Sequence, residues 1–520
     1  MHRKSIKIEV PIINTGSMKN LIKTLILCVA VCLMGKANAQ LINCNPDPNG
    51  EPWWAGDLPE VTSEIQAELD AIPPLVISSK SSATILPSQV DNSQRPWFRP
   101  VFSQNGGCCG QASSVGYTFT YEVNRVRNVS GSLPENQYPT HFTWNFLNKQ
   151  DKDGGSWYYQ GWDIIKQMGI PTVEDYGGMY KPNLSDLDRA NVWETGYEKY
   201  NEALNNKVLT EYHHIDVRTP SGLETLKHWI NDHGSGDVSG GLANFAAKIF
   251  NANYGILPNE SSGAGKKIVI GWGNDGLHAM TIVGYDDNVK YDFNGDGQFS
   301  NSDPNDLKTW EIGALKVVNS WGDWWLGNGG FVYMPYRLLA MPYISGGIYT
   351  NHFDTQKQVH VLSTTSSYHP EMTLKVKIKH SCRKKLSLFA DKAENANQIA
   401  SIGSMQYCAF NCPPAWSGAG CLPMQGINED PIEFCLDYVQ FYNLDSVAKV
   451  FFRVHQNFGQ HNGIISEFSL IDYRWNEVFE LQYPGSPSVS IVNNGNTRLG
   501  IPYHLLPFEN PIQNNLTLAT

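Results

Sequence analysis

The sequence predicts an α+β domain followed by a β-sandwich. Helical patterns come first in the central part of the chain, at 112–127, 160–168 and 222–233. Strand-like segments follow at 267–269, 278–285 and 314–318. This separation of helices from strands is typical of α+β architecture. After residue 351, short alternating segments separated by Gly, Asn and Pro turns predict an all-β module.

The 520 residues, 41% of them hydrophobic, can form more than one packed core. We place the α+β domain at 86–350 and the sandwich at 351–505. Residues 40–85 carry a short helical pattern at 63–72 before Pro73 and Pro74, and we interpret them as a propeptide or spacer. The tail at 506–520 resembles the start of a C-terminal sorting domain.

The N-terminal region, 1–39, carries the pattern of a secretory signal peptide, which we place at 18–39. Lys19 and Lys23 supply positive charge, an apolar run follows at 24–34, and Ala37-Asn38-Ala39 matches a cleavage site. The run is too short to span a bilayer, and no later segment reaches about 18 apolar residues. We therefore expect a secreted protein, extracellular or periplasmic, without a membrane span.

The net charge argues against one class of partner, and the cysteine content predicts disulfides. A net charge of -11 argues against a nucleic-acid partner, because phosphate binding requires clustered Lys and Arg. In an exported protein, cysteines commonly form disulfides. Five of the ten cysteines fall in one C-terminal stretch, and we expect bridges among them: Cys382, Cys408, Cys412, Cys421 and Cys435.

Three separated motifs in the α+β domain match one family. The first comprises L-P-S-Q-V-D at 86–91, P-V-F-S-Q at 100–104 and C-C-G-Q-A-S at 108–113. The second is L-H-A-M-T-I-V-G-Y at 277–285, and the third is V-N-S-W-G-D-W-W-L-G-N-G-G-F at 318–331. Together they resemble the papain family of cysteine peptidases. The resemblance covers about 86–348 and implies a two-lobed peptidase domain acting on polypeptides.

The resemblance also implies roles for individual residues. Cys109 is the expected nucleophile, because a helix N-terminus and an imidazolium can keep a thiol ionised. His278 is the expected proton carrier and Asn319 the residue that orients its ring. Gln104 is expected to donate to the oxyanion, together with the backbone N–H of Cys109. Gly154 and Gly155 resemble the glycine pair that binds an extended substrate.

The nucleophile position can be aligned in more than one way. The family usually has two cysteines three residues apart, with the second as nucleophile. If Cys109-Gly110 is aligned with the first of them, Ala112 takes the nucleophile position and the protein is inactive. If Cys109 is the nucleophile, it follows Gln104 by five residues instead of six. Ser113 is a third candidate nucleophile.

A calcium loop is predicted between the His278 and Asn319 motifs. Residues 292–303 place oxygen-bearing side chains and a glycine at the spacing of an EF-hand loop. We expect a structural Ca²⁺ here rather than a catalytic one. The expected ligands are Asp292, Asn294, Asp296, Gln298, Ser300 and Asp303.

Three functions follow from this reading. The first is a secreted cysteine peptidase that cleaves polypeptides through a Cys-His-Asn mechanism. The second is an inactive peptide-binding protein with Ala112 at the nucleophile position. The third is acyl transfer or amide hydrolysis on a non-protein substrate, because similar triads perform that chemistry too.

Overall fold

The computed structural model describes most of the chain beyond residue 57. The described residues are 58–147, 154–177, 195–348, 359–398, 402–407, 431–438 and 447–503, without 476 and 487. The predicted signal region, residues 40–57 of the predicted spacer and the tail at 506–520 lie outside them. Within these ranges, no helix is long and apolar enough to cross a membrane.

A continuous helix forms the centre of the first domain. It is made of α4 (Cys109–Gln111), η2 (Ala112–Phe119) and α5 (Thr120–Arg127), and its middle part has π-helical hydrogen bonding. The sequence predicts this helix from Ala112, whereas the structure starts it at Cys109. All residues from Cys109 to Asn124 are buried, as expected for a helix that is covered on every side.

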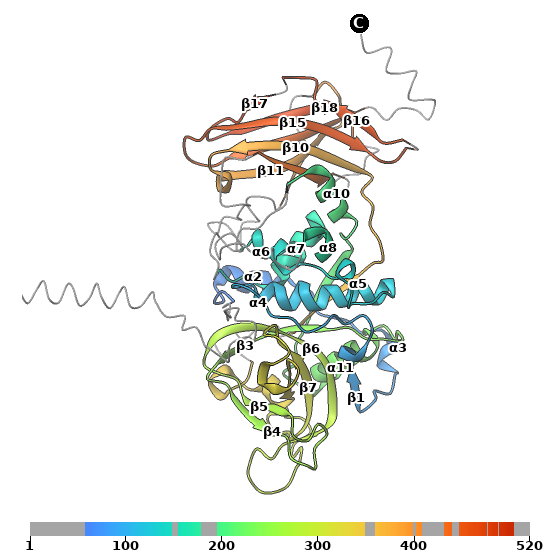
Figure 1. Cartoon of the computed structure of the whole chain (residues 1–520), viewed down its shortest axis with the longest axis vertical. Coiled ribbons are helices and arrows are strands. Elements are labelled where there is room, and N and C mark those ends of the chain that lie inside the picture. The colour runs from blue at the N-terminus through green and yellow to red at the C-terminus, as the bar shows by residue number, and fades with distance from the viewer. Residues whose placement is uncertain are drawn as a thin grey trace, which may run out of the picture. The chain divides into compact units, whose positions relative to one another are not determined.

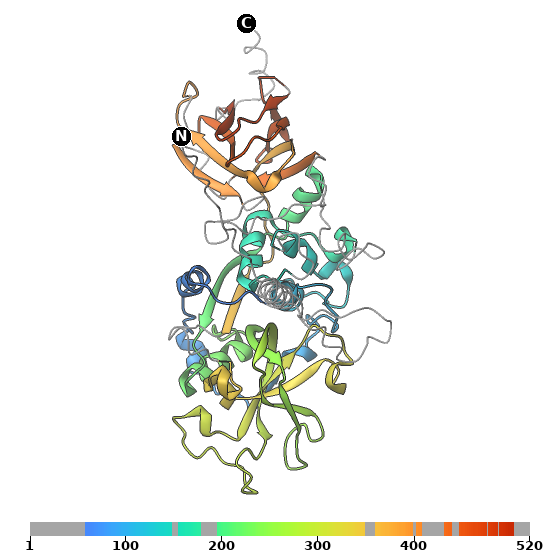
Figure 2. The same cartoon turned by 90° about the vertical axis from the view of Figure 1, so that its left-hand side faces the viewer.

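Helices cover one side of the central helix and strands cover the other (Figure 1). Figure 2 shows the same two groups from the side. On the helical side lie α6 (Thr140–Asn145), α7 (Tyr158–Met168), α8 (Val173–Tyr176) and α10 (Tyr197–Leu204). Other α-helices among the described residues of the domain are α2 (Ser63–Ala71), α3 (Ser79–Ser82), α11 (Pro220–Asp232) and α12 (Arg337–Ala340). The predicted helices at 160–168 and 222–233 correspond to α7 and α11.

A 9-stranded sheet lies on the other side, in the order β2-β9-β3-β6-β7-β8-β5-β4, with β1 paired to β6. Its strands are β1 (Gln89–Asp91), β2 (Leu209–Ile215), β3 (Ala243–Phe250), β4 (Asn253–Ile256), β5 (Lys267–Gly271), β6 (Asp275–Lys290), β7 (Ile312–Val318), β8 (Phe331–Pro335) and β9 (Val359–Thr364). The sequence predicts 359–362 as a strand of the sandwich. The structure instead inserts β9 between β2 and β3, so the first sheet extends beyond the predicted boundary at residue 350.

The C-terminal part forms two antiparallel sheets that share one core. The first has the order β13-β10-β15-β16 with β17 attached, and the second has the order β12-β11-β14-β18. Apolar side chains from both, such as Val376 and Phe452, belong to one buried cluster. The strands are β10 (Met372–His380), β11 (Leu386–Ala393), β12 (Ile402–Tyr407), β13 (Ile432–Asp437), β14 (Lys449–Gln456), β15 (Gly463–Asp472), β16 (Phe479–Gln482), β17 (Val489–Ser490) and β18 (Asn496–Pro502). The predicted fold class, α+β followed by a β-sandwich, is confirmed.

The predicted disulfides of this domain have no counterpart among the described residues. Cys382 and Cys435 are both thiols. Burial raises the pKa of the Cys435 thiol to about 12, so this thiol stays protonated at neutral pH. Cys408, Cys412 and Cys421 lie outside the described residues, and bridges among them stay a prediction.

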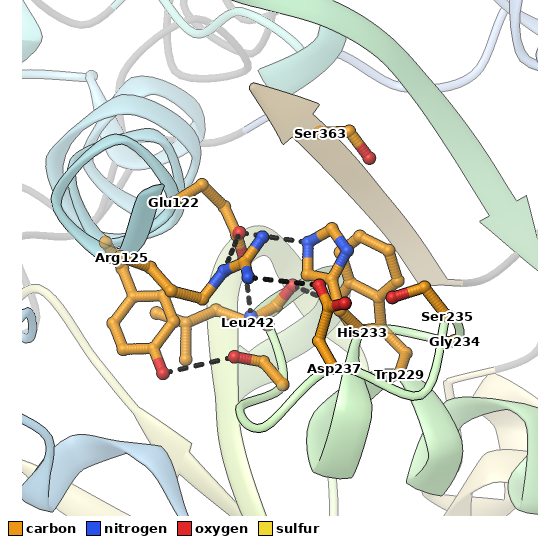
Figure 3. A network of polar contacts seen from close by, with 12 residues as sticks. Glu122, Arg125, Trp229, His233, Gly234, Ser235, Asp237, Leu242 and Ser363 are labelled. Carbon is orange, nitrogen blue, oxygen red and sulfur yellow. Dashed lines mark hydrogen bonds and ion pairs between the residues drawn. The ribbon is translucent and has the colours of Figure 1, made fainter. Parts of the chain in front are cut away.

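A buried ion cluster ties the central helix to the strands (Figure 3). The carboxylate of Glu122, on α5, is completely buried. It accepts hydrogen bonds from Leu242 N at 3.1 Å, from Arg125 Nε at 3.0 Å and from the His233 ring at 3.0 Å. Leu242 directly precedes β3, which pairs with β6. Glu122 therefore holds the helix that starts at Cys109 against the sheet that carries His278.

Candidate active site

Cys109 is the first residue of the central helix and is fully buried. The unpaired N–H groups of a helix N-terminus create a positive potential there. Such a potential favours thiolate over thiol. The local fold therefore gives Cys109 one of the two features that a cysteine nucleophile needs.

The neighbouring Cys108 is in a different environment. Its Sγ donates to the backbone carbonyl of Asn105 at 3.3 Å, and its side chain packs against Trp144. Burial raises the pKa of the Cys108 thiol to about 12, with hydrogen bonds lowering it only in part. Cys108 is therefore a protonated structural thiol at neutral pH.

Contacts along β6 show which end of the helix faces His278. The hydroxyl of Thr281 donates to Ser113 O at 3.1 Å. At the other end, Leu58 N donates to Leu277 O at 2.7 Å, and a Cβ placed on Gly110 would lie 3.2 Å from Leu58 Cδ2. The start of the helix thus lies at the level of Leu277 and His278. Ala112 and Ser113 lie about one turn further, at the level of Thr281.

His278 and Asn319 form a buried hydrogen-bonded pair. His278, on β6, brings its Nε2 to 2.7 Å from Asn319 Oδ1, and Asn319 directly follows β7. Asn319 Oδ1 also accepts from Ser320 N at 2.7 Å, which identifies this atom as the amide oxygen. The Nε2 of His278 must therefore carry the proton of this hydrogen bond. A proton taken from a thiol would then bind to the other ring nitrogen, Nδ1.

The ring of His278 is covered by an indole. Trp321 lies with its ring centre 4.7 Å from that of His278 and at an angle of 39°. Its side chain is buried, as are those of His278 and Asn319. This cover keeps water away from the His278–Asn319 hydrogen bond and so strengthens it.

Gln104 is held close to the same residues. Its backbone N donates to Ser320 O at 2.7 Å, and Ser320 Oγ donates to Gln104 Oε1 at 2.6 Å. The opposite end of the amide, Nε2, donates to Gly106 O at 3.1 Å. The Ser320 hydroxyl therefore fixes which end of the amide is the donor. The structure brings Gln104, His278 and Asn319 together, as the sequence predicts, and adds Ser320 and Trp321.

For the cysteine-peptidase chemistry that the three motifs predict, replacing Ser320 with Ala is expected to lower kcat by about tenfold, because the Gln104 amide loses its fixed orientation and donates less often to the oxyanion. The measurement is peptide hydrolysis by the S320A, Q104A and doubly substituted variants, with the exposed Ser132→Ala as control. The double variant is expected to be no slower than Q104A. Additive losses would contradict an effect that acts through Gln104.

The predicted glycine pair lies beside the first turn of the central helix. Gly154 O accepts from Trp144 Nε1 at 2.8 Å. A Cβ on Gly110 would lie only 2.0 Å from Ser156 O, so the loop packs directly on the helix next to Cys109. This position at the first turn is consistent with a substrate-binding role for Gly154 and Gly155, which stays a prediction.

An N-terminal strap, defined as residues 58–72, crosses the same region. Leu58 is 1% exposed and makes the contacts to Leu277 and Gly110 described above. The indole nitrogen of Trp157 donates to Pro59 O at 3.1 Å. Lys248 Nζ lies 4.0 Å from Glu60 Oε1. Sequence reasoning recognises this segment only as a propeptide or spacer, because its contacts are all distant in the chain.

The predicted calcium ligands lie in the hairpin between β6 and β7. The carboxylate of Asp292 accepts from Gly295 N at 2.7 Å and from Gly297 N at 2.9 Å. These backbone hydrogen bonds, that from Gly297 above all, lower the pKa of Asp292 and keep it ionised. Asn294 Oδ1 accepts from Asp296 N, and Asp296 Oδ1 accepts from Gln298 N, both at 2.8 Å.

The last predicted ligand turns toward a different part of the loop. Asp303 Oδ1 accepts from Asn305 N at 2.8 Å. The carboxylate that does face the start of the loop belongs to Glu311, which accepts from Phe293 N and Ser300 N, both at 3.1 Å. Across the described parts of the chain, no three His, Cys, Asp or Glu side chains are grouped as at a metal site.

The architecture and the site match the expectation from the three motifs. Cys109 starts a buried central helix, His278 lies on β6 and Asn319 directly follows β7. The α+β domain, with a buried central helix packed on a sheet, has the architecture expected from the resemblance to the papain family. No family model and no curated protein matches the chain.

Several solved structures are similar to this chain at low sequence identity. Xylellain, a cysteine protease from Xylella fastidiosa, has 16% identity and a TM-score of 0.36, over 60% of this chain and 96% of that chain. The proform of Amb a 11, a ragweed pollen cysteine protease, has 15% identity and a TM-score of 0.36, over 60% and 74%. The protease and lectin-like domains of Cwp84 from Clostridium difficile have 10% identity and a TM-score of 0.31, over 84% and 94%.

Proposed function

We propose that the protein is a secreted cysteine peptidase that hydrolyses peptide bonds with Cys109, His278 and Asn319. The observation that carries the proposal is the buried 2.7 Å pair of His278 and Asn319, beside a helix that starts with Cys109. The signal-peptide pattern at 18–39 supports secretion. A polypeptide is the proposed substrate because the loop with Gly154 and Gly155 packs beside Cys109 and suits an extended main chain.

The proposed reaction begins with transfer of the Cys109 proton to His278. The thiolate of Cys109 then attacks the carbonyl carbon of the substrate, and the carbonyl oxygen takes up the negative charge. Gln104 Nε2 and the backbone N–H of Cys109 donate hydrogen bonds to this oxygen. His278 returns its proton to the leaving amine, which forms a thioester and releases the C-terminal product.

Hydrolysis of the thioester completes the cycle. His278 removes a proton from water, and the resulting hydroxide adds to the thioester carbon. The carbon–sulfur bond then breaks, which releases the N-terminal product and restores the thiolate. Asn319 keeps the imidazole in the same orientation during both steps, because its amide oxygen accepts a hydrogen bond from Nε2–H throughout.

Covalent labelling tests this proposal directly. The full chain is treated with a peptidyl epoxide, and the adduct is mapped by peptide mass spectrometry. We expect rapid labelling of Cys109 and none of Cys108, and we expect the rate to fall to that of an ordinary thiol in the H278A variant. Labelling of Cys109 that is slow and independent of His278 would favour the inactive peptide-binding alternative.

We also propose that the loop at 292–303 binds a structural Ca²⁺. The residues present fit the ion in part: Asp292, Asn294 and Asp296 bring oxygen atoms into one tight turn, and Asp292 is held ionised. Glu311, and not Asp303, accepts a hydrogen bond from a backbone N–H at the start of the loop, so Glu311 takes the place of Asp303 in the proposed ligand set. The bound ion would join the two ends of the β6–β7 hairpin.

Removal of calcium is therefore expected to lower the melting temperature by about 5–10 °C, since saturation at about 100 times Kd stabilises by roughly 2.7 kcal/mol. The measurement is a thermal melt in excess Ca²⁺ and in excess chelator. Asp296→Asn and Glu311→Gln are each expected to reduce the difference, whereas the exposed Asp237→Asn is not. An identical melt with and without calcium would rule out the site.

A further inference from the structure

Two loops lie next to Cys109, and the proposed reaction needs both. The first, the oxyanion loop, is defined as residues 104–108 and carries the amide of Gln104. The second, the main-chain loop, is defined as residues 154–156 and packs on Gly110. Each loop contains two adjacent glycines and neither contains a helix or strand. Because a glycine backbone has wide conformational freedom, the positions of these loops depend on contacts with other elements.

The oxyanion loop is held by a histidine of α6. His141 is completely buried, and its Nε2 lies 2.7 Å from Asn105 O. Because a carbonyl oxygen can only accept, Nε2 must carry the proton of this hydrogen bond. The Cys108 thiol donates to the same oxygen at 3.3 Å, but a thiol is a weak donor. The hydrogen bond from His141 is therefore the stronger of the two that hold Asn105.

Asn105 directly follows the residue that supplies the oxyanion donor. Gln104 Nε2 donates to Gly106 O at 3.1 Å, and Cys108 N donates to the same oxygen at 2.8 Å. Gly106 has a φ of 79°, which glycine adopts without strain. The Gly106 carbonyl meets both donors only while the loop keeps this turn. His141 fixes the peptide group that joins Asn105 to Gly106, and so it holds the turn that orients the Gln104 amide.

The main-chain loop is held by a tryptophan about one turn further along α6. Trp144 is completely buried, and its Nε1 donates to Gly154 O at 2.8 Å. The ring centre of His141 lies 4.8 Å from that of Trp144. Residues three apart in a helix are neighbours on the same face. One face of α6 therefore holds both loops.

We propose that His141 and Trp144 are positioning residues for peptide hydrolysis: His141 places the oxyanion donor Gln104, and Trp144 places the loop that binds the substrate main chain. The hydrogen bonds of both side chains end on backbone carbonyls of the loops, so each residue acts through the loop that it holds. The kinetic consequence rests on the proposed peptidase function. An oxyanion donor acts in the transition state, whereas a main-chain contact already acts in substrate binding, so the two residues affect different kinetic constants.

Peptide hydrolysis by His141 variants tests the first role. His141→Phe keeps a ring beside Trp144 but has no N–H, and we expect kcat to fall by about tenfold while KM changes by less than about twofold. His141→Gln restores an N–H of similar reach and is expected to bring kcat back to within about threefold. His369→Phe, at an exposed position, is the control. If H141F does not fold, His141→Asn takes its place, because its shorter amide does not reach Asn105 O. A normal kcat in the variant that lacks the hydrogen bond would overturn the role of His141.

The same assay tests the second role. Trp144→Phe keeps an aromatic ring on α6 but lacks the indole N–H, and we expect KM to rise by about fivefold while kcat changes by less than about twofold. Trp97→Phe is the matched control, because it removes another indole hydrogen bond, from Trp97 Nε1 to Asn128 Oδ1 at 3.2 Å. This control is expected to leave KM unchanged. An unchanged KM in W144F would overturn the role of Trp144.

Two further measurements distinguish a failure of these roles from a failure of the peptidase. Alkylation of Cys109 by iodoacetamide reports the ionised thiol and needs neither loop, so its rate is expected to stay within about twofold in H141F and W144F. Slow alkylation and no hydrolysis by the unchanged protein would refute the peptidase. Hydrogen exchange then decides whether the two side chains hold the loops. We expect protection to fall by about three- to tenfold in peptides spanning 104–108 for H141F, and in peptides spanning 154–157 for W144F. Unchanged protection in both variants would overturn the proposal.

Discussion

Replacing Cys109 with Ala is expected to reduce kcat/KM for peptide hydrolysis by about 10⁴-fold or more, because the substitution removes the thiolate that forms the acyl-enzyme. The measurement is cleavage of a fluorogenic peptide by the purified protein. His278→Ala is expected to cause a loss of similar size, since the thiol then has no base. The combined variant is expected to be no slower than either alone, because the two residues act as one unit.

Cys108→Ala is the matched control for this experiment. Cys108 is as buried as Cys109, but its thiol donates to Asn105 O and stays protonated. We expect C108A to keep activity within about threefold and to lose roughly 1 kcal/mol of stability through the missing sulfur. The opposite pattern, with C109A active and C108A inactive, would reassign the nucleophile.

Replacing Glu122 with Ala is expected to lower the free energy of unfolding by about 3–5 kcal/mol at pH 7. The substitution removes the shared acceptor of the partly buried Arg125 and His233 side chains and of the buried N–H of Leu242. The measurement is denaturant unfolding followed by tryptophan fluorescence. Glu135→Ala removes an exposed carboxylate and is expected to change stability by less than about 0.5 kcal/mol.

The contribution of Glu122 to the free energy of unfolding is also expected to depend on pH. Burial raises the pKa of Glu122, but the charges of His233 and Arg125 outweigh burial and bring the pKa below its usual value. A lowered pKa contributes stability that is present above the unfolded value, about 4.3, and is lost as the pH falls through the folded value. The difference in stability between the unchanged protein and E122A should therefore shrink below about pH 4. A difference that grows in acid would contradict this sign.

Much of the fold and the site could be predicted because the informative residues are close together in the sequence. The helices at 160–168 and 222–233 follow from local periodicity, and the structure has them as α7 and α11. His278 and Asn319 lie in motifs whose neighbouring residues also match the resemblance. Their positions on β6 and directly after β7 place them side by side, since these strands pair.

The parts that could not be predicted depend on contacts between distant residues. Glu311 faces the loop at 292–303 from outside its 12-residue spacing, so no local motif indicates it. The position of Leu58 beside Leu277 depends on the path of the whole strap. The choice between Cys109 and Ala112 was open because either alignment required a change in length near the start of the helix. Thr281 lies opposite Ser113, which places Ala112 about one turn beyond the level of His278 and favours Cys109 as the nucleophile.

The insertion of β9 between β2 and β3 has a consequence for the order of folding. Strand β2 ends at residue 215 and β3 ends at residue 250, but β9, which pairs with both, starts only at residue 359. Until that strand is synthesised, β2 and one side of β3 are open edges that can pair with other chains. The first sheet is therefore completed late, by a pairing across more than a hundred residues, which slows folding. A chain shortened to the motif region would be left with the same open edges and a tendency to aggregate.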